Sequence, residues 1–214
     1  MAEQSESPGS RKRRPSQAER VAERRRQVGQ AARELIQEVG FEVLSVNTVA
    51  ERAGISTGGL YRYIRTKTDL LEMALDDINE GILDRMVAES GRERGIGAKL
   101  QAAMAAYWEM CWDSAEALRV SYRDFPSLPK EAQKRYIAQE AEFADFLADL
   151  IRAGVAAEEF RPVDERLLAH EIILLAQMKA TRGAALAGRD PKAVLAEHTE
   201  LVMSRLRTTS ARPG

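Results

Sequence analysis

The sequence has little of what secreted or membrane proteins require. It contains one cysteine, Cys111, which excludes an intramolecular disulfide and favours a reducing, cytoplasmic setting. It has no apolar run of about 18 residues, so we predict no membrane span. The basic stretch Arg11–Arg14 is not followed by the apolar segment of a secretory signal. We therefore expect a cytoplasmic protein that does not enter a membrane.

The chain also lacks the short motifs of several enzyme classes. GxSxG, HExxH, the P-loop and GxGxxG are all absent. The two histidines, His170 and His198, lie far apart on separate predicted helices, which disfavours a metal pair. The neighbours of Cys111 are apolar and should raise its pKa, which disfavours a redox sensor. The sequence predicts no enzyme activity, no cofactor and no metal.

Strand signals are nearly missing as well, since hairpin turns of the type Asn-Gly or Asp-Gly do not occur. Apolar residues recur instead at helical spacing between breaks at glycine and proline. Ser45 is a plausible N-cap, and Gly154 a plausible helix end. The pattern predicts an all-α fold with helices over 18–39, 46–53, 57–64, 67–90, 98–112, 114–124, 129–153, 164–186 and a last helix to about 207.

The net charge of -1 conceals an uneven distribution. Residues 1–70 hold 13 Lys/Arg against 9 Asp/Glu, whereas residues 71–214 hold 19 against 24. A basic head on an acidic body suggests that the head binds a polyanion. We predict a disordered basic arm over 1–17, a helix-turn-helix DNA-binding domain over 18–66, a connecting helix over 67–90, a helical ligand-binding and dimerisation domain over 91–208, and a disordered tail over 209–214.

The most specific signal lies between residues 45 and 71, which read SVNTVAERAGISTGGLYRYIRTKTDLL. Val49 and Ala53 lie on the inner face of a short helix, Gly54 permits a sharp turn, and Leu60 and Ile64 face inward from the next helix. Two short helices joined in this way form a helix-turn-helix, whose second helix reads the major groove of DNA.

A wider pattern includes this motif and extends from Val21 to Met73. Its matching positions are Gly40, Phe41, Val49, Ala50, Ala53 to Ser56, Leu60 to Ile64, Lys67, Leu70 and Leu71. The stretch resembles the DNA-binding head of the tetracycline-repressor (TetR) family. The rest of the chain agrees in length and helical character. The resemblance implies that the helical body binds a small molecule, which alters the spacing of two heads and releases DNA.

The candidate DNA contacts are Asn47, Thr48, Ser56, Thr57, Gly58, Tyr61, Arg62, Tyr63 and Lys67. Hydroxyls of Ser56 and Thr57 suit phosphate at a helix start, and Gly58 allows close approach to the groove. Arg62 suits a guanine edge, while Tyr61 suits a thymine methyl or a phosphate.

The sequence evidence for the other candidate DNA contacts is weaker. Tyr63 and Lys67 would hold phosphates, and Asn47 and Thr48 point outward beside the cap of their helix. The arginines of the arm, Arg11–Arg14, with Arg20 and Arg24–Arg26, would add phosphate or minor-groove contacts. Alternatives stay open: the tyrosines as core residues, the serines as helix caps, and the arm as a solubilising tail.

The body contains a helix, AAMAAYWEMCW at residues 102–112, that is apolar nearly all round. Its large side chains suit a cavity for an apolar or acyl-type ligand, and an ordinary packed core is equally compatible. Glu109 and Lys179 are charges in apolar stretches that need partners, such as Arg119 or Arg123 or a cationic ligand group for Glu109. The candidate ligand contacts are Met104, Tyr107, Trp108, Glu109, Cys111, Trp112, Arg123 and Met178.

The last two predicted helices have apolar stripes, and small residues follow the first of them. The stripes are Leu167, Leu168, Ile172, Leu175 and Met178, then Val194, Leu195, His198, Leu201, Val202 and Leu206. A monomer would expose this surface, so we predict a homodimer with twofold symmetry.

Together these features predict a DNA-binding transcriptional regulator. We expect a repressor that a small-molecule inducer releases from a near-palindromic double-stranded operator. Activation remains open. The alternative is a ligand-independent DNA-binding protein with weak sequence preference.

Overall fold

The computed structural model describes residues 16–208, and this part of the chain forms eleven α-helices, two 3-10 turns and no β-strand. The predicted all-α fold is therefore confirmed. Most of the predicted arm and the predicted tail, with Arg11–Arg14, lie outside the described residues. The last two residues of that arm, Ser16 and Gln17, begin the first helix.

Four helices build the head of the molecule. The first is capped by Ser16, whose hydroxyl accepts a hydrogen bond from the Glu19 backbone N–H at 3.1 Å. The fourth lies along the first and approaches it closely at Gly29, where a Cβ would be 2.4 Å from the Met73 carbonyl oxygen. The head helices are α1 (Gln17–Val39), α2 (Val46–Arg52), α3 (Thr57–Leu60) and α4 (Lys67–Asn79).

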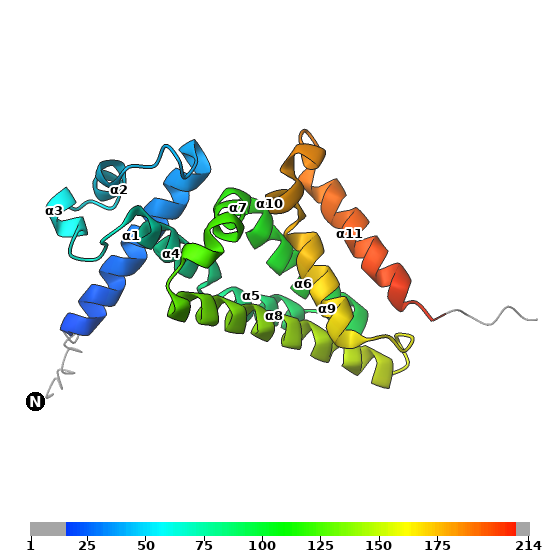
Figure 1. Cartoon of the computed structure of the whole chain (residues 1–214). Coiled ribbons are helices and arrows are strands. Elements are labelled where there is room, and N and C mark those ends of the chain that lie inside the picture. Colours follow the sequence, from blue (N-terminus) through cyan, green and yellow to red (C-terminus); the bar gives the residue numbers. More distant parts are fainter. Residues whose placement is uncertain (1–15, 209–214) are drawn as a thin grey trace, which may run out of the picture.

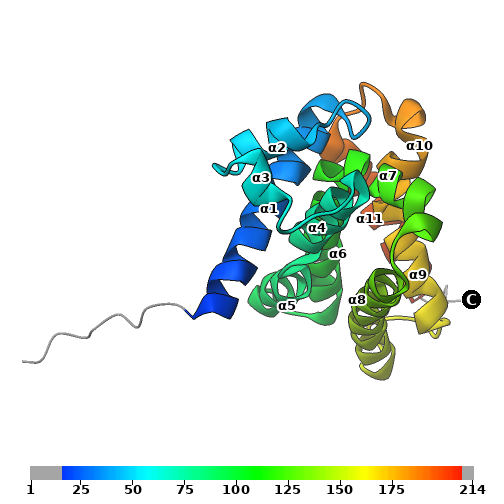
Figure 2. The same ribbon diagram turned by 60° about the vertical axis from the view of Figure 1, so that its left-hand side comes forward.

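The body is arranged around α6, which packs against α5, α8, α9 and α11. Helix α8 runs along one side of the body (Figures 1 and 2), and α11 lies at the edge farthest from α2 and α3 (Figure 1). The body elements are α5 (Ile82–Arg92), α6 (Ile96–Asp113), α7 (Ala115–Asp124), η1 (Phe125–Ser127), α8 (Lys130–Ala156), α9 (Glu165–Ala176), α10 (Met178–Arg182), η2 (Gly183–Leu186) and α11 (Pro191–Leu206).

Three expected helices end earlier than the sequence pattern indicated. The helix expected over 67–90 is divided between Asn79 and Ile82, where Gly81 adopts a left-handed φ of 73° that interrupts the helical path. The helix expected over 164–186 is interrupted at Gln177. Helix α3 ends at Leu60 instead of near residue 64.

Gly154 was expected to end its helix, and that expectation is wrong. It lies inside α8, which continues to Ala156. A Cβ at Gly154 would be 2.1 Å from a ring carbon of Phe160. The absence of a side chain therefore makes room for the buried Phe160 ring, and the glycine serves packing instead of helix termination.

Candidate DNA interface and ligand cavity

The turn between α2 and α3 is fixed by backbone hydrogen bonds at the end of α2. The Ile55 N–H donates to the Ala50 carbonyl at 2.9 Å, and the Gly54 N–H donates to the Glu51 carbonyl at 3.0 Å. This pair of bonds is the Schellman arrangement, which needs a left-handed residue, and Gly54 has a φ of 64°. Buried Val49 and the hydrogen-bonded turn therefore set the angle at which α3 leaves α2.

Several polar candidates at this motif are engaged within the head. The Ser56 hydroxyl accepts from the Gly59 N–H at 3.0 Å and so caps α3. The Thr57 hydroxyl donates to the Asn47 side-chain oxygen at 3.1 Å, which ties α3 to α2. The Thr48 hydroxyl donates to the Ser45 carbonyl at 2.8 Å within the cap of α2. These contacts hold the two helices in position.

Lys67 likewise has partners inside the head. Its ammonium donates to the Glu42 carbonyl at 2.9 Å and lies 4.8 Å from the centroid of the Phe41 ring. It joins the start of α4 to the loop between α1 and α2. We therefore assign Lys67 a role in positioning the motif and retain phosphate binding as a proposal.

The outward face of the motif presents Tyr61 and Arg62. Tyr61 is 57% exposed, Arg62 is exposed, and within residues 16–208 no side-chain hydrogen bond holds either of them. Gly58 is exposed too, and its missing Cβ would meet no atom within 4 Å. The half-buried Tyr63 shares a surface hollow with Arg62 and with basic residues of α1, among them Arg20 and Arg24. The motif and α1 therefore share a hollow in which three arginines lie together with Glu19 and Glu23.

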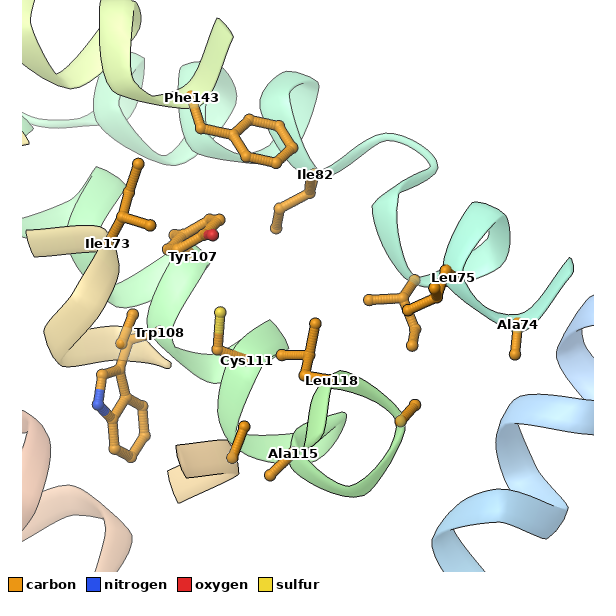
Figure 3. Close-up of a cluster of buried hydrophobic side chains, with 14 of the residues drawn as sticks. Ala74, Leu75, Ile82, Tyr107, Trp108, Cys111, Ala115, Leu118, Phe143 and Ile173 are labelled. Carbon is orange, nitrogen blue, oxygen red and sulfur yellow. The ribbon is translucent and has the colours of Figure 1, made fainter. Parts of the chain in front are cut away.

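A cavity of about 300 Å³ lies between α4, α6, α7 and α8. Leu75, Tyr107, Leu118 and Phe143, one from each of these helices, converge on this region of the body (Figure 3). The lining is mainly apolar, with a few polar groups among the aromatic rings, as in small-molecule sites.

Of the candidate ligand contacts given above, Tyr107 lines this cavity, and so does Met110, another large side chain of the apolar helix. Met104, Trp108 and Cys111 are buried in the core on α6, and Trp108 stacks on Trp112 with ring centroids 4.7 Å apart. Trp112 lines a different hollow near α10. The half-buried Met178 lies outside the cavity lining.

Two of the predicted charges lie on the surface. Glu109 is half exposed and pairs with Arg85, so its expected pairing with Arg119 or Arg123 is wrong. Arg123 pairs instead with Glu42 at 2.8 Å, which joins α7 to the head. The apolar sequence around Glu109 suggested a buried carboxylate. In the structure Glu109 is exposed and lies beside α5, where Arg85 reaches it.

Within residues 16–208, no acidic side chain pairs with Lys179. Its ammonium donates to the Trp112 carbonyl at 2.9 Å and lies 4.4 Å from the Trp112 ring centroid. A carbonyl and a ring face therefore compensate its charge.

Apart from Tyr107, the polar residues that line the cavity were not predicted. Gln177, at the break between α9 and α10, donates through its amide to the Tyr107 hydroxyl at 3.1 Å and to the Glu140 carboxylate at 3.3 Å. Tyr122 and Tyr136 also line the space. A weak signal was available, because Tyr136 and Glu140 lie one helical turn apart on α8.

Burial and charge act in the same direction on the titratable groups of this region. Burial raises the pKa of Tyr107 well above its usual value, and the neighbouring Cys111 and Glu140 add to that effect. Burial also raises the pKa of Tyr122, with further contributions from Cys111 and Glu140. Burial raises the pKa of Cys111 to about 12. The phenols and the thiol are therefore neutral at physiological pH.

Helix α4 connects the cavity to the head. The Tyr136 hydroxyl, at the cavity, donates to the Glu72 carbonyl at 2.9 Å and contacts the Asp76 carboxylate at 3.1 Å. On the other side of α4, Asp77 pairs with Arg33 of α1 at 2.6 Å. A single helix therefore contacts both the wall of the cavity and the longest helix of the head.

Among residues 16–208, no group of three or more His, Cys, Asp or Glu side chains is placed to hold a metal ion. None of the helices described there is both long and apolar enough to cross a bilayer.

Both the N-terminal and the C-terminal part of the chain match known protein families. Residues 30–74 match the family model described as bacterial regulatory proteins, tetR family, and residues 93–181 match that of the tetracyclin repressor-like C-terminal domain. The HTH-type transcriptional regulator HbdR of Aromatoleum sp. (strain CIB) is 30% identical over 186 residues, which cover 84% of this chain and 77% of HbdR. The regulator BetI of Escherichia coli O127:H6 is 29% identical over 70% of this chain and 89% of BetI.

Solved structures share the fold. A TetR/AcrR-family regulator from Thermobifida fusca superposes with a TM-score of 0.72 at 23% identity and covers 87% of this chain and 100% of its own. AibR, solved in complex with isovaleryl coenzyme A and operator DNA, superposes with a TM-score of 0.64 at 18% identity over 83% of this chain and 97% of its own. At these identities the likeness concerns the fold alone.

Proposed function

Since this chain belongs to the TetR family and is a DNA-binding transcriptional regulator, we propose that it acts as a repressor. In this proposal a homodimer binds a near-palindromic double-stranded operator through its two helix-turn-helix motifs. A small molecule enters the cavity between α4, α6, α7 and α8 and releases the protein from the operator.

The shared use of α4 is the observation that supports release by a ligand. Leu75 and Asn79 of α4 line the cavity, whereas Gly29 of α1 packs on the backbone of α4 at Met73. A ligand that changes the cavity shape displaces α4, and α1 moves with it because close-packed helices shift as units. In a dimer this motion alters the spacing of the two α3 helices, which must match half-sites one helical turn of DNA apart.

Dimerisation is supported by apolar side chains on the outer faces of α9 and α11. Leu167 and Leu174 of α9 are 56% and 63% exposed, and Leu201 of α11 is 59% exposed. Not all of the predicted stripe is available, because Leu168 and Ile172 are buried inside the protomer. We therefore propose α9 and α11 as the dimer surface, with Leu167, Leu174 and Leu201 as its apolar contacts.

The DNA-binding half of the proposal is tested with a duplex selected from a random pool by the purified protein. Arg62→Ala removes an exposed guanidinium from the outward face of the motif, and we expect roughly tenfold to hundredfold weaker binding to the selected duplex. Arg94→Ala is the matched control, because Arg94 is equally exposed but lies before α6. Fluorescence anisotropy gives both affinities. Unchanged binding by the Arg62 variant contradicts the assigned DNA interface.

The repressor function and the alternative function give different results with the same duplex. Placed within a promoter, the selected sequence should lower reporter expression when the protein is present. The selected duplex should also bind at least a thousandfold more tightly than random DNA at physiological salt. If the protein binds both duplexes with equal affinity and no small molecule changes either affinity, it is a ligand-independent binder with weak sequence preference.

A further inference from the structure

The cavity contains one charged residue among those that line it, and that residue is acidic. Glu140 of α8 is half-buried, and its carboxylate accepts a hydrogen bond from the Gln177 amide at 3.3 Å. Among residues 16–208, no lysine, arginine or histidine forms an ion pair with Glu140. The nearby Arg135 is committed to Glu72 and Asp76 of α4, each at 3.0 Å. The negative charge at the cavity wall is therefore uncompensated.

The wall beside Glu140 contributes polar groups, and the described lining residues include no lysine, arginine or histidine. Gln139, adjacent to Glu140 on α8, also lines the cavity, but its side-chain oxygen is buried away from the open space. Glu140 is therefore the group of this wall that carries charge. An uncompensated carboxylate at a cavity wall favours a ligand with positive charge.

The remainder of the lining is suited to the same charge. The rings of Tyr107, Tyr122, Phe125, Tyr136 and Phe143 surround the space, and the Tyr107 and Phe143 ring centroids are 5.4 Å apart. The faces of aromatic rings attract cations. The negative charge of Glu140 acts on both Tyr107 and Tyr122. It adds to the effect of burial and raises the pKa of each phenol.

We propose that the ligand of this cavity is an organic ammonium with an apolar body. The ammonium pairs with Glu140, while the apolar body lies among the aromatic rings and Leu75 and Leu118. The volume of about 300 Å³ admits roughly ten water-sized groups, which limits the ligand to a small molecule. This inference rests on the proposed function, because it names the chemical class of the inducer.

The assignment changes the expectation of an acyl-type ligand. An acyl compound with a free carboxylate would bring a second negative charge next to Glu140, and no basic side chain from the described part of the chain lines the cavity to offset it. A neutral apolar compound fills the space and leaves the carboxylate of Glu140 without a cation. An ammonium with an apolar body fills the space and compensates that charge.

The test compares three probes of one shape that differ in charge: phenylpropylamine, phenylpropanol and phenylpropanoate. Isothermal titration calorimetry of the full chain without DNA measures each affinity. We expect the protonated amine to bind at least tenfold more tightly than the alcohol, and the carboxylate to bind most weakly. Glu140→Gln should remove the preference for the amine while leaving the affinity for the alcohol unchanged.

Glu142→Gln is the matched control, because Glu142 is on the same helix but exposed to solvent and outside the cavity lining. It should retain the preference for the amine. An amine that binds no more tightly than the alcohol, a preference that survives Glu140→Gln, or no detectable binding of the amine overturns the proposal. Operator release is measured separately. Amine binding that depends on Glu140 but leaves the operator complex intact sustains the ligand class and contradicts the release mechanism.

Discussion

At Gly29 the two longest helices of the head, α1 and α4, approach each other closely. Alanine usually stabilises a helix by about 1 kcal/mol relative to glycine. Here its Cβ would be 2.4 Å from the Met73 carbonyl oxygen, which is backbone and has no rotamer by which to move away. We expect Gly29→Ala to lower the free energy of unfolding by about 1–3 kcal/mol, as measured by urea denaturation.

Gly58→Ala provides the control for that substitution. Gly58 also lies in a helix of the head, but an added Cβ would meet no atom within 4 Å. The free energy of unfolding of the Gly58→Ala variant should equal that of the unaltered protein or exceed it by up to about 1 kcal/mol. Equal effects of the two substitutions would contradict the close approach of α1 to α4.

Cys111 has a thiol that burial keeps neutral. It is 1% exposed, and its pKa is raised to about 12, chiefly by burial. Only the thiolate attacks disulfide reagents, and at neutral pH a group with this pKa is almost entirely protonated. We expect the folded protein to resist an aromatic disulfide reagent and the denatured protein to react stoichiometrically. Rapid labelling of the folded protein would show that this core opens readily.

At the scale of elements, the hydroxyl of Tyr136 connects α8 to α4. It donates to the Glu72 carbonyl and contacts Asp76, whereas no side-chain hydrogen bond of the Tyr122 hydroxyl occurs within residues 16–208. Both tyrosines line the cavity. We expect Tyr136→Phe to lower the free energy of unfolding by about 1 kcal/mol, and Tyr122→Phe to change it little, in urea denaturation. Equal losses would refute the link between α8 and α4.

The extent to which elements could be predicted depends on how local their causes are. Ser16 and Ser45 cap their helices through residues three positions away, and the sequence indicated both helix starts to within a residue or two. The turn at Gly54 was predictable for the same reason. The break at Gln177 was not, because its side chain contacts Tyr107 and Glu140, which are distant in sequence.

The ligand cavity was harder to predict than the helix-turn-helix motif for a related reason. Its walls come from helices spread between residues 67 and 177. An apolar helix such as α6 indicates a buried environment, but it does not tell a cavity wall from a filled core. Trp108 and Tyr107 are neighbours with the same signal, yet one stacks on Trp112 and the other lines the cavity.

The arrangement of head and body separates the proposed dimer surface from the DNA-binding motif. The proposed dimer surface on α9 and α11 lies on the far side of the body from α2 and α3 (Figure 1). A ligand between them acts on α4 while this surface keeps the two copies together. The dimer would then supply a fixed frame against which the heads move.

The double substitution Leu174→Glu with Leu201→Glu tests this frame. Both side chains are more than half exposed in the protomer, so the charges should not disturb its fold, and circular dichroism should be unchanged. In a dimer they would be buried without partners, which costs several kcal/mol, so sedimentation should show monomers where the unaltered chain is dimeric. The monomer should bind the selected duplex at least tenfold more weakly, because it can engage one half-site only. Val87→Glu, on exposed Val87 of α5, is the control and should remain dimeric. A double variant that stays dimeric would place the interface elsewhere.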